Sequence, residues 1–123
     1  MLLSKPIDLL PSTAAPQWTS RKISALVDTG ATISGVRRDL FKELELPLIG
    51  RVLVDTASET IETERVLAQV STSGAGVDAP PFKKTGHFAV FNGTDELLLG
   101  MDFLKGGRLV VDLVEGWWEW TRE

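Results

Sequence analysis

Short apolar or β-branched segments, each bounded by turn-forming residues, run through most of this chain. Strands are predicted at 23–27, 48–54, 60–70, the second half of 82–91, 97–100, 108–113 and 117–121. Helical spacing of apolar residues covers 37–46, which Pro47 ends, and 101–105 offers one or two further helical turns. Many short strands with one or two short helices predict an all-β, barrel-like domain.

Two hairpins are expected within this pattern. The polar break Thr56-Ala57-Ser58-Glu59 separates two strand segments, so that 48–70 reads as one long β-hairpin. Strict alternation fails near Glu64 and Arg65, which indicates a bulge or a strand that leaves the core. Residues 108–121 form the second hairpin, and 71–81, rich in glycine and proline, is predicted to be a loop.

The length of 123 residues suits a single domain. Pro6, Pro11 and Pro16 fall within the first twenty residues. Because proline fixes φ and lacks a backbone N–H, this stretch can be extended or looped but can pair at most as an edge strand. We therefore expect an extended N-terminal segment over 1–20, followed by the folded domain over 21–123.

Composition removes several classes of function. The net charge of −4 gives no basic footprint for nucleic acid, so no nucleic-acid partner is expected. The chain has no cysteine, which excludes thiolate nucleophiles and cysteine metal sites. His87 is the single histidine and is interpreted as a strand residue, and no serine occupies a Gly-x-Ser-x-Gly turn. Neither a metal site nor a serine hydrolase is indicated.

Membrane association is also not indicated by the sequence. No apolar run approaches the roughly 20 residues that cross a bilayer. The first residues are interrupted by Lys5, Pro6 and Asp8, which makes them a poor signal peptide. No membrane partner is expected, and a cytoplasmic location is the default expectation.

Two segments carry a resemblance to a known family. The first is Ala25-Leu26-Val27-Asp28-Thr29-Gly30-Ala31-Thr32, and the second is Leu97-Leu98-Leu99-Gly100-Met101-Asp102-Phe103-Leu104. Together, with a hairpin between them, they resemble the active-site loop and the hydrophobic-Gly segment of the retropepsin-like aspartic peptidases. The resemblance organises residues 21–113 and implies the acid-protease fold, a closed barrel with one or two short helices.

The resemblance implies an aspartic endopeptidase that needs no cofactor and no metal. In this family two carboxylates share one proton, and one acts as base on a water while the other acts as acid toward the scissile carbonyl. Asp28 would supply the only carboxylate of this kind. The run Val54-Asp55-Thr56-Ala57 imitates the motif, but Ala57 stands where the glycine must turn, so Asp55 is not assigned a catalytic role.

The second carboxylate must then come from a second copy of the chain, because a two-fold axis presents the same residue twice. By resemblance, Thr29 holds the partner's loop across the axis, and Gly30, Ala31 and Thr32 face a bound peptide or protein substrate. The hairpin tip, with Ala57, Ser58 and Glu59, closes over the substrate as a flap. Segment 1–20 could pair at a sheet edge or at this homodimer interface.

Some residues fit either of two interpretations. Leu98 and Leu99 belong to the core whatever the activity, so with Gly100 they support the fold more than the function. Thr32 and Met101 replace charged residues of the viral members, so a viral-type ion pair is absent. Trp117, Trp118 and Trp120 could be core, dimer surface or a patch for a partner. The alternative to an active peptidase is a catalytically silent dimerisation or peptide-binding domain of the same fold.

Overall fold

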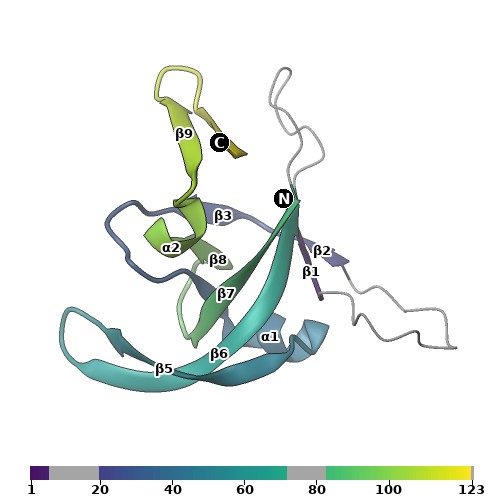
Figure 1. Ribbon diagram of the computed structural model, residues 1–123, viewed down its shortest axis with the longest axis vertical. Coiled ribbons are helices and arrows are strands. Elements are labelled where there is room, and N and C mark those ends of the chain that lie inside the picture. The colour runs from purple at the N-terminus through teal and green to yellow at the C-terminus, as the bar shows by residue number, and fades with distance from the viewer. Residues whose placement is uncertain (6–19, 72–82, 123) are drawn as a thin grey trace, which may run out of the picture.

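The computed structural model describes residues 1–5, 20–71 and 83–122. These residues form mostly strands, which confirms the all-β class (Figure 1). The strands are β1 (Leu2–Ser4), β2 (Ser20–Lys22), β3 (Ala25–Val27), β4 (Gly35–Arg37), β5 (Leu48–Asp55), β6 (Thr60–Ser71), β7 (Lys83–Phe91), β8 (Leu97–Leu99), β9 (Gly107–Asp112) and β10 (Trp117–Arg122). The two short helices are α1 (Arg38–Leu44) and α2 (Met101–Leu104).

One sheet of eight strands curls into a half-barrel. Its order is β2-β1-β6-β7-β4-β8-β3, and β5 pairs with β6 beside this path. The long strand β6 organises the sheet, because its first part pairs with β5, its last part with β1, and most of its length with β7. In Figure 1 the β5–β6 hairpin arches below the rest of the sheet.

The expected long hairpin and its irregularity are both present. β5 and β6 pair antiparallel from Asp55↔Thr60 to Leu48↔Val66, and the register shifts between Leu48 and Gly50. Gly50 has φ +150°, a conformation that L side chains rarely adopt. The irregularity expected near Arg65 is therefore present in this region, but the extra residue, Ile49, lies on β5 opposite Arg65 and Val66 and not on β6 itself.

Three short strands and part of a fourth were not predicted from sequence. β1, β2 and β4 have three residues each, too few to show an alternation pattern. The prediction that only the second half of 82–91 is a strand was wrong, because β7 begins at Lys83 and pairs with β6 along the whole run from Ser71↔Lys83 to Arg65↔Ala89. Most of the loop expected at 71–81 lies outside the described residues.

The core lies between the sheet, α1 and α2. Its centre holds Phe88, Phe103 and Trp120, whose rings follow one another at centroid distances of 5.9 and 6.1 Å. The buried hydrophobic residues around them include Leu3, Val36, Leu40, Leu44, Val66, Val70, Val90, Leu97 and Leu99. Leu40 and Leu44 come from one face of α1, as the helical spacing predicted, and Glu45 ends that helix with φ 51°.

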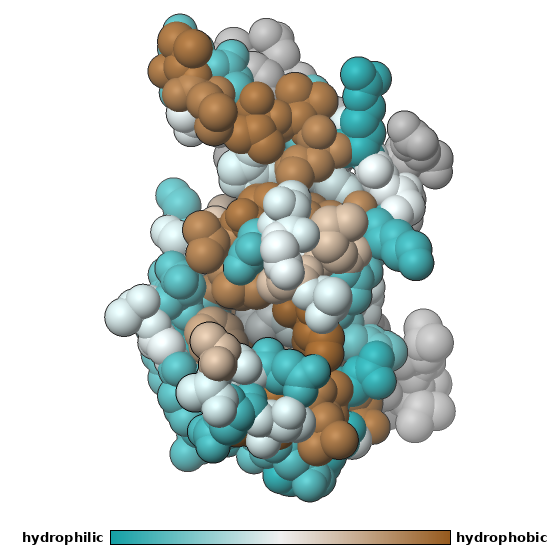
Figure 2. Space-filling model, turned by 90° about the vertical axis from the view of Figure 1, so that its left-hand side faces the viewer, coloured by the Kyte–Doolittle hydropathy of each residue, from teal (hydrophilic) through white to brown (hydrophobic). Residues whose placement is uncertain are grey.

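The C-terminal hairpin β9–β10 forms a second, two-stranded sheet. It stands at the top of the molecule in Figure 1, and the side view in Figure 2 shows hydrophobic side chains gathered along it. The tryptophans at this end have more than one environment, since Trp120 is buried in the core and Trp118 packs against it while partly exposed. No helix in the described part of the chain is long and apolar enough to cross a membrane.

An ion pair fastens α1 to the sheet. Arg38 donates two hydrogen bonds to the carboxylate of Glu64 on β6, at 3.0 and 3.1 Å. These bonds, together with those from the backbone of Glu64 and from the Thr63 hydroxyl, lower the pKa of Glu64 to about 2. Both side chains are about one quarter to one third exposed, so solvent screens part of the attraction.

This pair should make stability depend on pH. The pKa of Glu64 in the folded protein lies below its ordinary value of 4.5, so the stabilisation is complete above that value and is lost as the pH falls toward 2. We expect Glu64→Gln to lower the free energy of unfolding by about 1 kcal/mol at pH 7 and by much less near pH 2. Urea unfolding at both pH values and one protein concentration measures the difference.

The matched control is Glu62→Gln. Glu62 pairs with Arg51 on the neighbouring strand, but both side chains are 56% exposed. Such a pair contributes little, so this substitution should change stability by less than about 0.5 kcal/mol at either pH. Equal losses for the two variants would contradict the assignment of a stabilising role to Glu64.

Candidate active site

Asp28 sits in a tight turn at the end of β3. Its backbone N–H donates to the carbonyl of Leu99 at 2.9 Å, which continues the pairing of β3 with β8 by one residue. The N–H of Gly30 donates to Asp28 Oδ1 at 3.0 Å, and the N–H of Ala31 to the Asp28 carbonyl at 3.2 Å. A Cβ on Gly30 would lie 3.3 Å from Asp28 Oδ1. The turn therefore fixes the position of Asp28 Oδ1, and none of these hydrogen bonds is made to Oδ2.

The second segment of the sequence pattern lies directly against this turn. Met101 and Asp102 donate their N–H groups to the carbonyls of Ala31 and Thr32, at 2.8 and 3.2 Å. A Cβ on Gly100 would lie 2.8 Å from the carbonyl oxygen of Ala31 and 2.9 Å from that of Ile33. Because backbone atoms cannot give way, only glycine fits at this crossing. The structure thus brings Gly100 together with the Asp28 turn, although they are far apart in sequence.

Hydrogen bonds between the buried Ser34 and Asp102 stabilise the place where the Gly100 backbone crosses the Asp28 turn. The hydroxyl of Ser34 donates to Asp102 Oδ1 at 2.5 Å and accepts the N–H of Gly100 at 2.8 Å, while the N–H of Ser34 donates to Asp102 Oδ1 at 2.9 Å. Sequence reasoning assigned no role to either residue. The signal that could have found them is a serine inside the apolar run 33–36, because a buried hydroxyl needs partners.

The remaining predicted site residues divide into two groups. Leu99 is fully buried in the core, as expected, whereas Leu98 is only half-buried and does not belong to the buried core, so the expectation for Leu98 was wrong. Thr29, Gly30 and Thr32 are exposed, and Ala31 is half-buried. Their polar groups are therefore accessible at the surface next to the Asp28 carboxylate.

The tip of the β5–β6 hairpin is closed by Thr56. Its N–H and its hydroxyl both donate to the carbonyl of Glu59 at 2.7 Å, and its hydroxyl accepts the Glu59 N–H at 3.1 Å. Ala57 and Ser58 are therefore displayed as an exposed turn, and Glu59 follows them. In Figure 1 this tip and the loop after β3 both reach the left-hand side of the molecule.

Asp55 has a separate environment in that hairpin. Its Oδ1 accepts the hydroxyl of Thr60, its antiparallel partner, at 2.6 Å. Asp55 thus closes the last pair of the hairpin, while Asp28 lies at the end of β3 in the crossing with Gly100.

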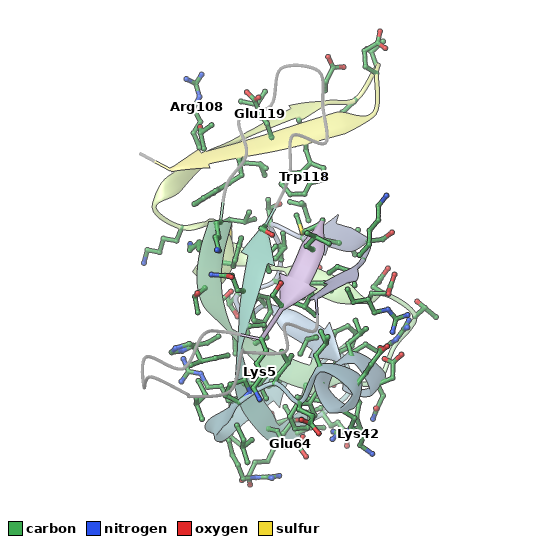
Figure 3. All side chains as sticks on the ribbon, turned by 90° about the vertical axis from the view of Figure 1, so that its right-hand side faces the viewer. Lys5, Lys42, Glu64, Arg108, Trp118 and Glu119 are labelled. Atoms are coloured by element: carbon green, nitrogen blue, oxygen red, sulfur yellow. The ribbon has the colours of Figure 1, made fainter. Side chains whose placement is uncertain are left out.

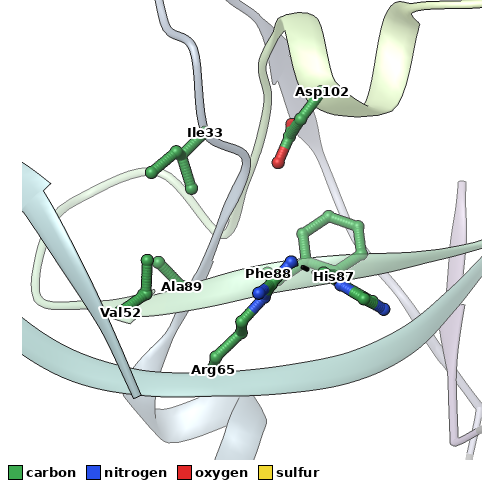
Figure 4. A pocket seen from close by; sticks show the side chains of 7 residues that line it. All are labelled: Ile33, Val52, Arg65, His87, Phe88, Ala89 and Asp102. Atoms are coloured by element: carbon green, nitrogen blue, oxygen red, sulfur yellow. Dashed lines mark hydrogen bonds between the residues drawn. The ribbon is translucent and has the colours of Figure 1, made fainter. Parts of the chain in front are cut away.

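A hollow of about 120 Å³ lies between the loop after the Asp28 turn and the sheet (Figure 4). It is lined by Ile33, Val52, Arg65, His87, Phe88, Ala89 and Asp102. Arg65 Nη2 lies 2.6 Å from His87 Nδ1. Because a guanidinium only donates, Nδ1 must accept, and the hydrogen of the imidazole is then on Nε2. The hollow combines the apolar side chains of Ile33, Val52, Phe88 and Ala89 with the guanidinium of Arg65, the imidazole of His87 and the carboxylate of Asp102.

One carboxylate cannot serve as acid and base at the same moment. In this chain the Asp28 turn lies at the end of β3, which is the terminal strand of the sheet path, and the edge residue Leu26 is 45% exposed. A terminal strand leaves room for another turn of the same kind to approach. The Asp28 turn therefore presents one carboxylate at an edge of the sheet.

Comparison with known proteins gives two findings. The family model described as aspartyl protease matches residues 17–103, which include the Asp28 turn, the β5–β6 hairpin and Gly100. A protein of Archaeoglobus fulgidus, described only as uncharacterized, is 32% identical over 115 residues, which cover 91% of this chain and 83% of that protein.

The stabilising role of the Ser34 hydrogen bonds can be tested by removing its hydroxyl. Ser34→Ala leaves the buried Gly100 N–H without its acceptor and takes one donor from Asp102. We expect the free energy of unfolding to fall by about 1–3 kcal/mol. Ser58→Ala, at the exposed hairpin tip, is the control and should change it by less than about 0.5 kcal/mol. Urea unfolding compares the two variants, and an unchanged free energy of unfolding for Ser34→Ala would disprove the stabilising role of these hydrogen bonds.

Proposed function

This chain belongs to the aspartyl protease family, and on that premise we propose that it is a homodimeric endopeptidase whose catalytic pair consists of Asp28 from each copy. The observation that carries the proposal is the single Asp28 turn at the end of a terminal strand, held by the Gly30 N–H and by the Leu99 carbonyl. A two-fold axis beside β3 would bring two such turns together.

In the proposed reaction the two carboxylates share one proton. The ionised one removes a proton from a water molecule, whose oxygen bonds to the carbonyl carbon of the scissile peptide. The protonated one donates its proton to the carbonyl oxygen, which gives a tetrahedral diol. The C–N bond then breaks as the nitrogen takes the proton that the first carboxylate had removed from water, while a diol hydroxyl returns its proton to the second carboxylate. A carboxylic acid and an amine leave, and the pair again holds one shared proton. The Gly30 N–H favours a fixed carboxylate orientation throughout.

The surroundings of Asp28 give the other predicted residues their proposed roles. The exposed hydroxyl of Thr29 is available to hydrogen-bond the partner's turn. Gly30, Ala31 and Thr32 would contact the peptide backbone beside the scissile bond. The displayed tip with Ala57, Ser58 and Glu59 would close over an extended peptide, which main-chain hydrogen bonds can hold.

The second candidate is a dimeric peptide-binding domain without turnover. Every contact that fixes the Asp28 turn would serve such a domain equally well, since these contacts orient backbone as well as carboxylate. Incubation with an unbiased peptide library separates the two proposals. An active peptidase gives defined cleavage products by mass spectrometry, whereas a binding domain enriches peptides and leaves them intact.

The catalytic role of Asp28 is tested by Asp28→Asn. This change keeps the shape of the side chain but removes the shared proton site, so cleavage should fall by about a thousandfold or more while the dimer still forms. Asp55→Asn is the control, because it alters an aspartate of the hairpin that lies against Thr60. It should keep most of the activity. Substantial cleavage by Asp28→Asn, measured on a fluorogenic peptide, would refute the assignment.

The shared site predicts a dependence on concentration. Specific activity should fall in proportion to protein concentration below the dimer dissociation constant, because a monomer has half a pair. Mixing wild type with about a threefold excess of Asp28→Asn should reduce the activity per wild-type chain to roughly a quarter, which is the chance that a wild-type chain has a wild-type partner. A dilution series of cleavage beside analytical ultracentrifugation measures both. Full specific activity in a sedimenting monomer would exclude the shared pair.

A further inference from the structure

The hollow beside the Asp28 turn is lined by side chains of opposite charge. Ile33, from the loop after β3, and Asp102 of α2 line one side of it, and residues of β5, β6 and β7 line the other. Figure 4 shows the side chain of Arg65 reaching into this space from β6, while the carboxylate of Asp102 points toward it from α2. A cation and an anion therefore face the same small space from two separate elements.

Both charged groups are held in place and keep unused hydrogen-bonding capacity. Arg65 Nη2 donates to His87 Nδ1, and the guanidinium has further N–H groups. Asp102 Oδ1 accepts the hydroxyl and the N–H of Ser34, whereas no hydrogen bond between described residues is made to Asp102 Oδ2. Neither Arg65 nor Asp102 forms a salt bridge with another described residue. The hollow thus presents donors on one wall and an acceptor on the other.

The charges that face the hollow sum to zero. Arg65 contributes one positive charge and Asp102 one negative charge, and His87 is neutral when its Nδ1 accepts a hydrogen bond. Glu64 precedes Arg65 on β6 and so points to the other face of the strand, at the same end of the molecule as Lys42 (Figure 3). An acidic side chain in the hollow would be repelled by Asp102, and a basic one by Arg65. A neutral group that both accepts and donates hydrogen bonds is repelled by neither.

The size of the hollow suits a short polar side chain. Its volume of about 120 Å³ is below the roughly 150 Å³ of a cavity that holds a benzene ring. A carboxamide has an oxygen that can accept from Arg65 and an NH2 group that can donate to Asp102. The methylene groups that carry it can pack against Val52 and Ala89. An apolar side chain of the same size would leave both charged groups without partners.

The hollow adjoins the surface on which a substrate peptide is expected. Its lining begins at Ile33, the residue after the predicted substrate contact Thr32. Asp102 connects the two directly, because its N–H donates to the Thr32 carbonyl at 3.2 Å while its side chain lines the hollow. A side chain of a peptide that lies along Thr32 can therefore enter the hollow.

From this we propose that the hollow is a specificity pocket, which takes the side chain of glutamine or asparagine from the substrate. Arg65 donates to the carboxamide oxygen, and Asp102 Oδ2 accepts a hydrogen bond from the carboxamide nitrogen. The proposal rests on the proposed function, because the peptide that fills the pocket is the one held for cleavage at Asp28. It adds the class of side chain that the protein selects.

Peptide libraries test this preference. Each library fixes one position in turn as glutamine, asparagine, glutamate, lysine or leucine and leaves the other positions mixed. Cleavage by the wild-type chain is followed by mass spectrometry. At one position, glutamine or asparagine should give a kcat/KM at least about tenfold higher than glutamate, lysine or leucine, because the other side chains leave Arg65 or Asp102 unpaired or opposed.

Two substitutions should move the preference in opposite directions. Asp102→Asn retains an oxygen for Ser34 and leaves Arg65 as the only charge, so glutamate should gain at least about tenfold relative to glutamine. Arg65→Gln leaves Asp102 as the only charge, so lysine should gain instead. Arg51→Gln is the matched control and should leave the preference unchanged, because Arg51 pairs with Glu62 and does not line the hollow. A residue that only supports the fold would change the rate for all peptides alike.

Binding to the same libraries separates this proposal from the peptidase. Asp28→Asn chains are immobilised, with and without Asp102→Asn or Arg65→Gln, and the retained peptides are identified. If thermal unfolding shows that Asp102→Asn does not fold, Arg65→Gln, which alters an exposed residue, decides alone.

Each outcome then has one meaning for the pocket. Selective retention of carboxamide peptides, with the expected shifts, by a chain whose wild type cleaves nothing supports the pocket and refutes the peptidase. Cleavage with no preference at any position, or with a preference that Arg65→Gln leaves unchanged, refutes the pocket and leaves the peptidase intact. A chain that neither cleaves nor retains carboxamide peptides selectively overturns both.

Discussion

The close crossing of two backbone segments governs the organisation of this protein. Asp28 can be presented at the end of β3 only because the turn after it lies against Gly100, whose missing side chain lets the carbonyls of Ala31 and Ile33 approach. Hydrogen bonds from Met101 and Asp102 then bind the turn to α2. The functional group of the site is thus held by backbone contacts from both ends of the domain, which is a rigid support.

The same crossing explains the burial of one polar side chain, that of Ser34. Its hydroxyl and its N–H donate to Oδ1 of the exposed Asp102, and the hydroxyl accepts the N–H of Gly100. A buried hydroxyl is stabilising only when it has such partners. The support of the Asp28 turn therefore includes Ser34 and Asp102, which lie outside the turn itself.

The fold leaves two features incomplete within one chain. The Asp28 turn lies on a terminal strand and offers one carboxylate, and the β9–β10 hairpin carries an apolar face that its own chain covers only at the base. The second copy of the chain proposed above would complete the first of these features. Association would then be linked to activity, because only the dimer holds the complete pair.

The sequence by itself determined the all-β class, the long hairpin, helix α1 and the Asp28 and Gly100 segments, because periodicity, turn residues and two short patterns are local properties. It did not determine β4, the parallel pairing of β3 with β8, or the contact of Ser34 with Asp102. Segments of three residues have no readable period, and partners 68 positions apart meet only when the chain is folded. Tertiary structure alone decided that Trp120 is core while the turn at Leu113 and Val114 is surface, because burial depends on what packs above each face.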